Sequence, residues 1–147
     1  MDDQTRRKNW LGLLAKSCPN TVNQLCENLA EARSYDWLRQ PEVGGVMVRG
    51  RMGGTGSAFN MGEITVTRCS LRLPDGVVGH GYVQGRDKTH ATNAALVDAL
   101  MQTDRADQID SDVLQPLRQK RAQQQAAIQA RANATKVDFF TMVRGDD

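Results

Sequence analysis

The chain has 147 residues, of which 39% are hydrophobic and 24% charged, and its formal net charge is +2 at pH 7. This length predicts a single domain with a modest core. No apolar run approaches the ~18 residues of a membrane span, and the N-terminus lacks the basic and apolar pattern of a secretory signal, so we expect no membrane contact and a cytoplasmic location.

The cysteines and histidines do not indicate a catalytic or metal site. Cys18, Cys26 and Cys69 are odd in number and match no zinc spacing, so we interpret them as small buried hydrophobic residues. His80 and His90 have side chains suited to general-base chemistry near neutral pH. Neither has an evident nucleophile or orienting carboxylate at a defined spacing, and we therefore predict no catalytic residue, metal or cofactor.

Two helices are predicted at the N-terminus. The first covers residues 3–16, and Pro19 ends it because proline disfavours helical geometry in the residue before it. The second runs to about Ala32, and its apolar residues recur with helical spacing. They are Val22, Leu25, Cys26 and Leu29. The two helices form a predicted hairpin that covers one face of a sheet.

The middle of the chain predicts a small antiparallel sheet. Residues 35–39 are expected to form a short connector, extended or 3₁₀, which Pro41 and the following glycine pair end. Three strands are predicted, at 46–52, 63–73 and 77–84. The turn Pro74-Asp75-Gly76 joins the last two, and a phase shift after Val66 indicates a bulge or burial on both faces.

A third helix is predicted for residues 88–102, with Asp87 as its N-cap. Its alanine-rich face permits a close approach to the sheet. Residues 103–112 then form a predicted acidic linker. A polar helix follows from about Gln115 to Ala134, with five cations and no acidic residue between Val113 and Val137.

The fold class predicted from these elements is α+β. A small antiparallel meander is covered by an N-terminal helical hairpin and a following helix, with a long C-terminal helix and an apolar tail. Residues 1–103 are expected to form the core. Residues 104–147 are expected to add the linker, the polar helix and the tail within the same single domain.

Two basic, glycine-containing loops have the composition of anion sites. The first contains Arg51, Gly53, Gly54 and Gly56, and glycine lets backbone N–H groups converge on an anion. A hairpin loop that needs positive φ explains these glycines equally well, and no Gly-Lys-Ser/Thr of a P-loop follows.

The second loop lies at the start of the third helix. It carries three basic side chains, and a helix N-terminus favours anions. They are Arg86, Lys88 and His90. The alternative is a capped, solvated helix start in which Arg86 pairs with Asp87 or Glu63. The polar helix is also basic, but it lacks the aromatic residues of single-strand binders, so nucleic acid is not predicted as a partner.

The tail formed by residues 136–145 is more apolar than a chain terminus usually is. Such a tail must pack on its own domain or on another chain. We expect it to be a partner interface, formed by Val137, Phe139, Phe140, Met142, Val143 and Arg144.

Several segments carry a resemblance to a known family. They are Arg51–Gly56, Thr67–Arg68, Gly85–Lys88 with His90–Ala91, Ala95–Met101 and Val137–Asp146. These segments look like those of PhnG proteins, small subunits of the carbon–phosphorus lyase system of phosphonate metabolism. The resemblance runs from about Trp10 to the end, and residues 110–134 match in length and polarity more than in identity.

The resemblance implies an accessory, non-catalytic subunit in a hetero-oligomer with PhnI-, PhnH- and PhnJ-like subunits. Together with the ATPase-like PhnL, such complexes let an alkylphosphonate displace adenine from the ribose of ATP, which gives a ribose 1-phosphonate 5-triphosphate. The nucleosidase activity is attributed to PhnI, and the iron–sulfur radical chemistry belongs to PhnJ. This chain has no cysteine set for such a cluster, so no catalytic residue is carried over.

Two other classes of function stay open at the level of sequence. The chain could contact phosphonate or triphosphate directly through Arg51, Arg86, Lys88 and His90. It could also be a free-standing nucleotide- or nucleic-acid-binding module, which would show salt-dependent binding by the isolated chain.

Overall fold

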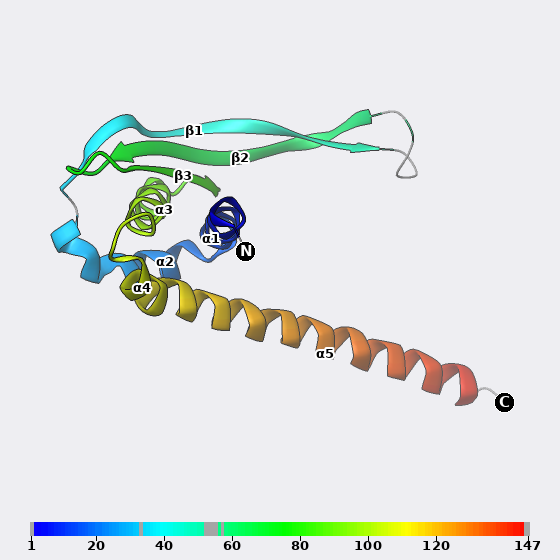
Figure 1. Cartoon of the computed structure of the whole chain (residues 1–147). Coiled ribbons are helices and arrows are strands. Elements are labelled where there is room, and N and C mark those ends of the chain that lie inside the picture. Colours follow the sequence, from blue (N-terminus) through cyan, green and yellow to red (C-terminus); the bar gives the residue numbers. More distant parts are fainter. Residues whose placement is uncertain (1, 33, 52–55, 57, 146–147) are drawn as a thin grey trace.

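The computed structural model describes residues 2–32, 34–51, 56 and 58–145. Its elements form one body from which a strand pair and a helix project (Figure 1). They are α1 Asp3–Lys16, α2 Pro19–Leu25, the 3₁₀ helix η1 Cys26–Ala32, β1 Asp36–Arg51, β2 Ala58–Arg72, β3 Val78–Gln84, α3 Lys88–Leu100, α4 Ala106–Ile109, the π-helical turn η3 Asp110–Leu114, and α5 Gln115–Gly145.

The sheet is an antiparallel meander in the order β1-β2-β3, which confirms the predicted α+β class. Gly76 has a φ of +93°, and the backbone N–H of Leu73 donates to Val77 O at 2.8 Å, so the predicted turn closes the β2–β3 hairpin. The helices lie on one side of this sheet in Figure 1. Among them, α1 and α3 contact the sheet, whereas α2 packs on α3 and covers the sheet only indirectly.

The predicted close approach of α3 to the sheet is confirmed. A Cβ at Gly79 would overlap Ala95 O, and a Cβ at Gly81 would overlap Ala91 O. The two glycines lie on the same side of β3, two residues apart, where alternate strand residues face one way. The distance between α3 and the sheet is therefore set by glycines on β3 that face alanines on α3.

The first strand is longer than predicted, because Asp36–Arg51 is continuous and no separate connector exists. Pro41 does not end it, since β1 is an edge strand in which a missing N–H need not cost a ladder bond. Register shifts in the β1–β2 pairing lie between Trp37 and Arg39 and between Arg39 and Glu42. The irregularity suspected after Val66 is thus a set of bulges in the partner strand.

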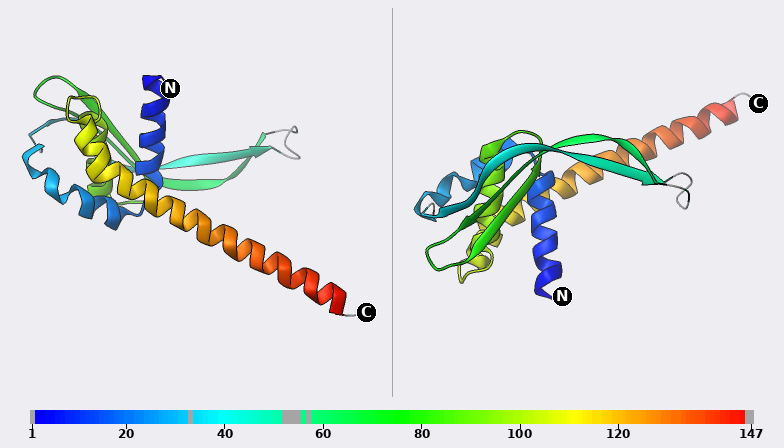
Figure 2. Two further views of the ribbon diagram at one scale, coloured as in Figure 1. Left: turned by 60° about the horizontal axis from the view of Figure 1, so that its bottom comes forward. Right: turned by 90° about the horizontal axis from the view of Figure 1, so that it is seen from above.

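Strands β1 and β2 extend beyond the third strand as a two-stranded arm. Gln84, the last residue of β3, pairs with Val66, whereas the β1–β2 pairing continues to Arg51 and Ala58. Figure 2 shows this arm leaving the body. One face of the arm carries aliphatic side chains from both strands, because paired residues on neighbouring strands project from the same face of a sheet. Its residues are Val46, Val48, Ile64 and Val66.

The segment after α3 is helical, where the sequence predicted an acidic linker. Ile109, Val113 and Leu117 recur every four residues and join the buried core, as does Leu114. The acidic residues of this segment lie on the sides of the helix that do not face the core. One of them, Asp110, pairs with Arg118 at 2.8 Å. Apolar spacing therefore decides the structure here over local charge.

Helix α5 does not end near Ala134 but continues to Gly145. Neither glycine nor proline interrupts residues 117–144, so nothing in this stretch breaks a helix. The predicted tail is therefore the last turns of α5. The side chains of residues 137–147 lie outside the described part of the chain.

Candidate functional site

Arg86 and Lys88 flank a helix N-terminus that already has a cap. Asp87 Oδ1 accepts a hydrogen bond from the backbone N–H of His90 at 2.9 Å. Asn23 Nδ2 lies 3.4 Å from Asp87 Oδ2, and Asn23 in turn accepts from Asn93. Arg86 is exposed, as is Lys88. The carboxylate of Asp87 thus occupies the position that a bound anion would take.

His90 does not face this loop. Its side chain is 1% exposed, and Nε2 lies 2.8 Å from Leu14 O, so Nε2–H is the donor of this hydrogen bond. Among the described residues Nδ1 has no hydrogen-bond partner. Burial lowers the pKa of His90, against the opposing effects of the Leu14 carbonyl and the Asp87 carboxylate. His90 therefore links α3 to α1 and cannot meet a solvent anion without rearrangement.

The described ends of the two loops predicted as anion sites lie far apart. The backbone N–H of Gly85 donates to Thr65 O, whereas Arg51 pairs with Ala58 at the far end of the arm. Seven residues of β2 separate those positions, or about 23 Å at ~3.3 Å per residue. Gly53 and Gly54 lie outside the described residues, as does the side chain of Arg51, and Gly56 forms a bend.

A buried carboxylate that the sequence reasoning missed joins three elements. Asp98 is fully buried, and Arg7 donates to both of its oxygens at 3.1 and 2.8 Å. Trp10 Nε1 and the backbone N–H of His80 also donate to it, at 2.8 and 2.9 Å. The carboxylate in turn raises the pKa of Arg7. An aspartate inside the apolar run 94–101 of α3 was the signal that could have revealed it.

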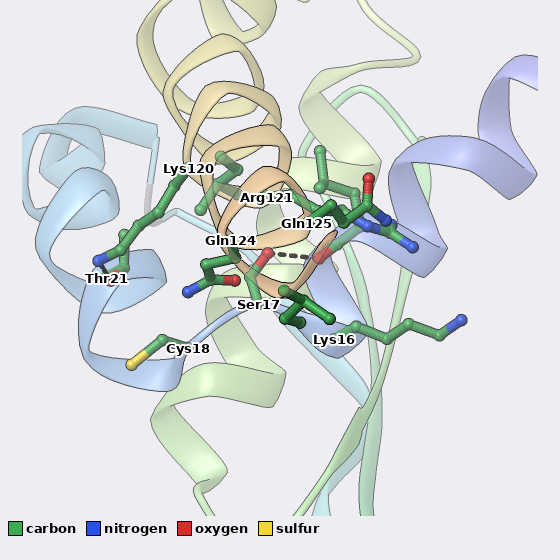
Figure 3. A pocket seen from close by; sticks show the side chains of 11 residues that line it. Lys16, Ser17, Cys18, Thr21, Lys120, Arg121, Gln124 and Gln125 are labelled. Carbon is green, nitrogen blue, oxygen red and sulfur yellow. Dashed lines mark hydrogen bonds between the residues drawn. The ribbon is translucent and has the colours of Figure 1, made fainter. Parts of the chain in front are cut away.

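Outside these clusters, a groove lies between the α1–α2 corner and α5 (Figure 3). It encloses about 190 Å³. Leu13 and Leu117 contribute to its apolar lining, and Ile128, 65% exposed, lies at its outer end. Lys120 crosses toward α2 and donates to Thr21 Oγ1 at 2.9 Å. No acidic residue is among the described residues that line this groove.

The thiols differ in their surroundings. Cys18 lies in this groove and is exposed, contrary to the prediction that all three cysteines are buried. Hydrogen bonds from the backbone N–H groups of Thr21 and Asn20 lower its pKa, with smaller help from Lys120. Cys26 and Cys69 are buried as predicted, and burial raises the pKa of Cys69 to about 11. Cys69 Sγ donates to Ala91 O at 3.2 Å.

Comparison with known proteins gives a match over almost the whole chain. The family model described as "Phosphonate metabolism protein PhnG" matches residues 5–145. The chain belongs to the PhnG family. A curated relative from Rhizobium meliloti (strain 1021), named alpha-D-ribose 1-methylphosphonate 5-triphosphate synthase subunit PhnG, is 40% identical over 145 residues. The match covers 97% of this chain and 91% of the relative.

The extent of the match places both projections inside the PhnG domain. Residues 5–145 include all but the first two residues of α1, the whole β1–β2 arm and α5 to its last turn. The long basic helix and the arm are therefore not appendages added to a smaller PhnG core. Within the described residues, no helix combines the length and apolar character that crossing a membrane requires.

Proposed function

We propose that this chain is an accessory subunit of a synthase complex that transfers the ribose 5-triphosphate part of ATP to an alkylphosphonate with release of adenine. The observation that carries the proposal is the 40% identity to the PhnG subunit of such a synthase over 97% of the chain. The proposed partners are PhnI-, PhnH- and PhnJ-like subunits, and the PhnI-like nucleosidase subunit would receive the apolar end of α5.

The chemistry of the buried groups supports an accessory role. Besides the thiols of Cys26 and Cys69, Asp98 and His90 are the ionisable side chains that the described part of the chain buries. Asp98 accepts four hydrogen bonds, and His90 is tied to Leu14. Both are engaged in holding helices together, which leaves neither poised to act on a substrate.

The proposed partner interface lies at the end of α5. Residues 139, 140 and 143 fall on one side of a helix by their spacing, and two of them are phenylalanines. An interface of this kind resembles a protein core divided between two chains, as in permanent complexes.

Co-expression with the PhnI-, PhnH- and PhnJ-like subunits of the same organism tests the proposal. The full chain should co-purify with a tagged PhnI-like subunit, and a chain that lacks residues 137–147 should not. Circular dichroism of the truncated chain checks that its body is still folded. Failure of the full chain to co-purify would refute the proposal, and normal assembly of the truncated chain would refute the tail as interface.

Direct contact with triphosphate or phosphonate is a second proposal, favoured by the exposed cations Arg86 and Lys88 beside the N-terminus of α3. In that case Arg86→Ala should lower turnover of the complex while leaving its assembly intact. Unchanged turnover at saturating and at low substrate concentration would argue against it.

A further inference from the structure

The groove beside α5 continues along the helix as one line of residues. At about 100° per residue, five positions after Leu117 fall within about 40° of the line that runs along α5 through Leu117. They are Arg121, Gln124, Ile128, Arg131 and Thr135. Because α5 continues unbroken to Gly145, positions 139 and 142 fall on the same line. We call residues 117, 121, 124, 128, 131, 135, 139 and 142 the α5 stripe.

The described part of the stripe is buried only at its beginning. Leu117 is in the core and contributes to the lining of the groove, whereas every residue from Arg118 to Lys136 is exposed. A helix that is polar and exposed on all sides usually bridges to another body or is unstable alone. Apart from alanines, Ile128 is the apolar residue of this stretch, and it lies on the stripe at 65% exposure.

Positive charge accompanies the apolar positions. Of the cations of α5, Arg118 pairs with Asp110 and Lys120 contacts a hydroxyl group. Arg121 and Arg131, which lie on the stripe, have no acidic partner among the described residues. Figure 3 shows Lys16 at the mouth of the groove, pointing away from Lys120. Between residues 117 and 131 the stripe therefore carries two apolar residues and two arginines that no acid among the described residues neutralises.

We propose that the α5 stripe, from the groove at Leu117 to position 142, binds an amphipathic, acidic segment of a partner subunit. The segment's apolar residues would lie on Leu117, Ile128 and position 139, and its carboxylates would meet Arg121 and Arg131. Charge complementarity and the helix-in-groove mode of recognition support this occupant. The inference rests on the proposed function and names a longer contact than the tail alone.

A nucleic acid fits the stripe less well. Residues 117–136 contain no aromatic side chain on which bases could stack, and Ile128 and Leu117 give the stripe an apolar character. The whole chain carries a net charge of only +2. An acidic protein segment satisfies both the apolar and the charged positions.

Two paired variants of the full chain test the proposal in binding to the tagged partner complex. Arg121→Gln with Arg131→Gln removes two positive charges from the stripe. Gln119→Glu with Gln123→Glu changes the net charge equally at positions about 160° and 120° away from the line through Leu117, with residues of similar helix propensity. We expect the arginine variant to raise the Kd about tenfold at low salt and to flatten its dependence on NaCl, because exposed ion pairs are screened by salt. The glutamate control should bind as the parent does.

The apolar part of the stripe is tested by Ile128→Gln, with Ala130→Gln on the opposite side as its control. Of these two variants, Ile128→Gln should weaken binding to the partner complex and Ala130→Gln should not. If the parent chain assembles and both paired variants bind equally well at all salt concentrations, the stripe is not the interface, while the proposed function stands. If the parent does not assemble, the proposed function itself fails. A loss of oligonucleotide binding in the arginine variant, with subunit binding unchanged, would also overturn the inference in favour of nucleic acid.

Discussion

At the scale of single residues, Asp98 holds the helical layer to the sheet. Replacing it by alanine leaves the indole N–H of Trp10 and the backbone N–H of His80 without their acceptor, and it removes the partner of Arg7. Breaking a buried charge pair costs about 3–5 kcal/mol, so we expect Asp98→Ala to lower the free energy of unfolding by about that amount. Urea denaturation measures the loss.

Arg7 and Asp104 supply the comparison. The side chain of Arg7 is 34% exposed, so water can replace part of what it loses, and Arg7→Ala should cost clearly less than Asp98→Ala. Asp104 is exposed, and Asp104→Ala should change stability by less than about 0.5 kcal/mol. Equal effects of Asp98→Ala and Asp104→Ala would show that the buried carboxylate contributes no more to the free energy of unfolding than an exposed one.

His90 should make stability depend on pH. Burial lowers the pKa of His90 below its value in the unfolded chain, so below about pH 6.5 the unfolded chain binds a proton that the folded one excludes. The contribution of His90 to the free energy of unfolding is therefore complete at pH values above its pKa in the unfolded chain. It falls as the pH decreases toward the folded pKa, by at most about 1.4 kcal/mol per pH unit.

Unfolding free energies measured between about pH 7.5 and 5 test this. His90→Gln, which cannot take up a proton in this range, should be less stable at pH 7.5 but should lose most of the slope. A slope that is the same in both proteins would assign the pH dependence to other groups.

At the scale of elements, the contact between α3 and β3 depends on residues without bulk. Gly81→Ala would drive a methyl group into the backbone of Ala91, which cannot yield as a flexible side chain can. We expect a loss of at least about 2 kcal/mol in the free energy of unfolding. Gly44→Ala is the matched control, because a Cβ at Gly44 meets nothing within 4 Å and should be nearly neutral. A neutral Gly81→Ala would mean that helix and sheet can separate at little cost.

The sequence predicted those elements whose local signals agree with their environment. The alanine-rich face of α3, the cap at Asp87 and the turn at Gly76 are examples in which the local pattern and the packing favour the same structure. It predicted poorly where tertiary context overrides a local signal. Pro41 interrupts a strand by propensity, yet an edge position tolerates it.

The side chains predicted to form one anion site at the start of α3 do not share one environment. His90 and Arg86 are close in sequence, but Arg86 lies in the exposed bend before the N-cap Asp87, whereas His90 lies in the first turn of α3 and is buried. The groove beside α5 could not be predicted at all, because it joins residues 13–21 to residues 117–128, and no local pattern records that contact.

At the scale of the whole molecule, the body and its two projections should differ in stability in the isolated chain. Figures 1 and 2 show that the arm and α5 leave the same side of the body. A two-stranded ribbon is only marginally stable in water, and an exposed helix depends on its weak intrinsic propensity. We therefore expect fast amide hydrogen exchange in the part of the arm between Val66 and its tip at Ala58, and in α5 beyond Ala122. We expect slow exchange in α3 and β3.

Hydrogen exchange measured by mass spectrometry on the chain alone, and then on the co-purified complex, tests this prediction. Protection of both projections only in the complex would identify them as parts that a partner completes, whereas uniform protection in the isolated chain would show that they are stable without one.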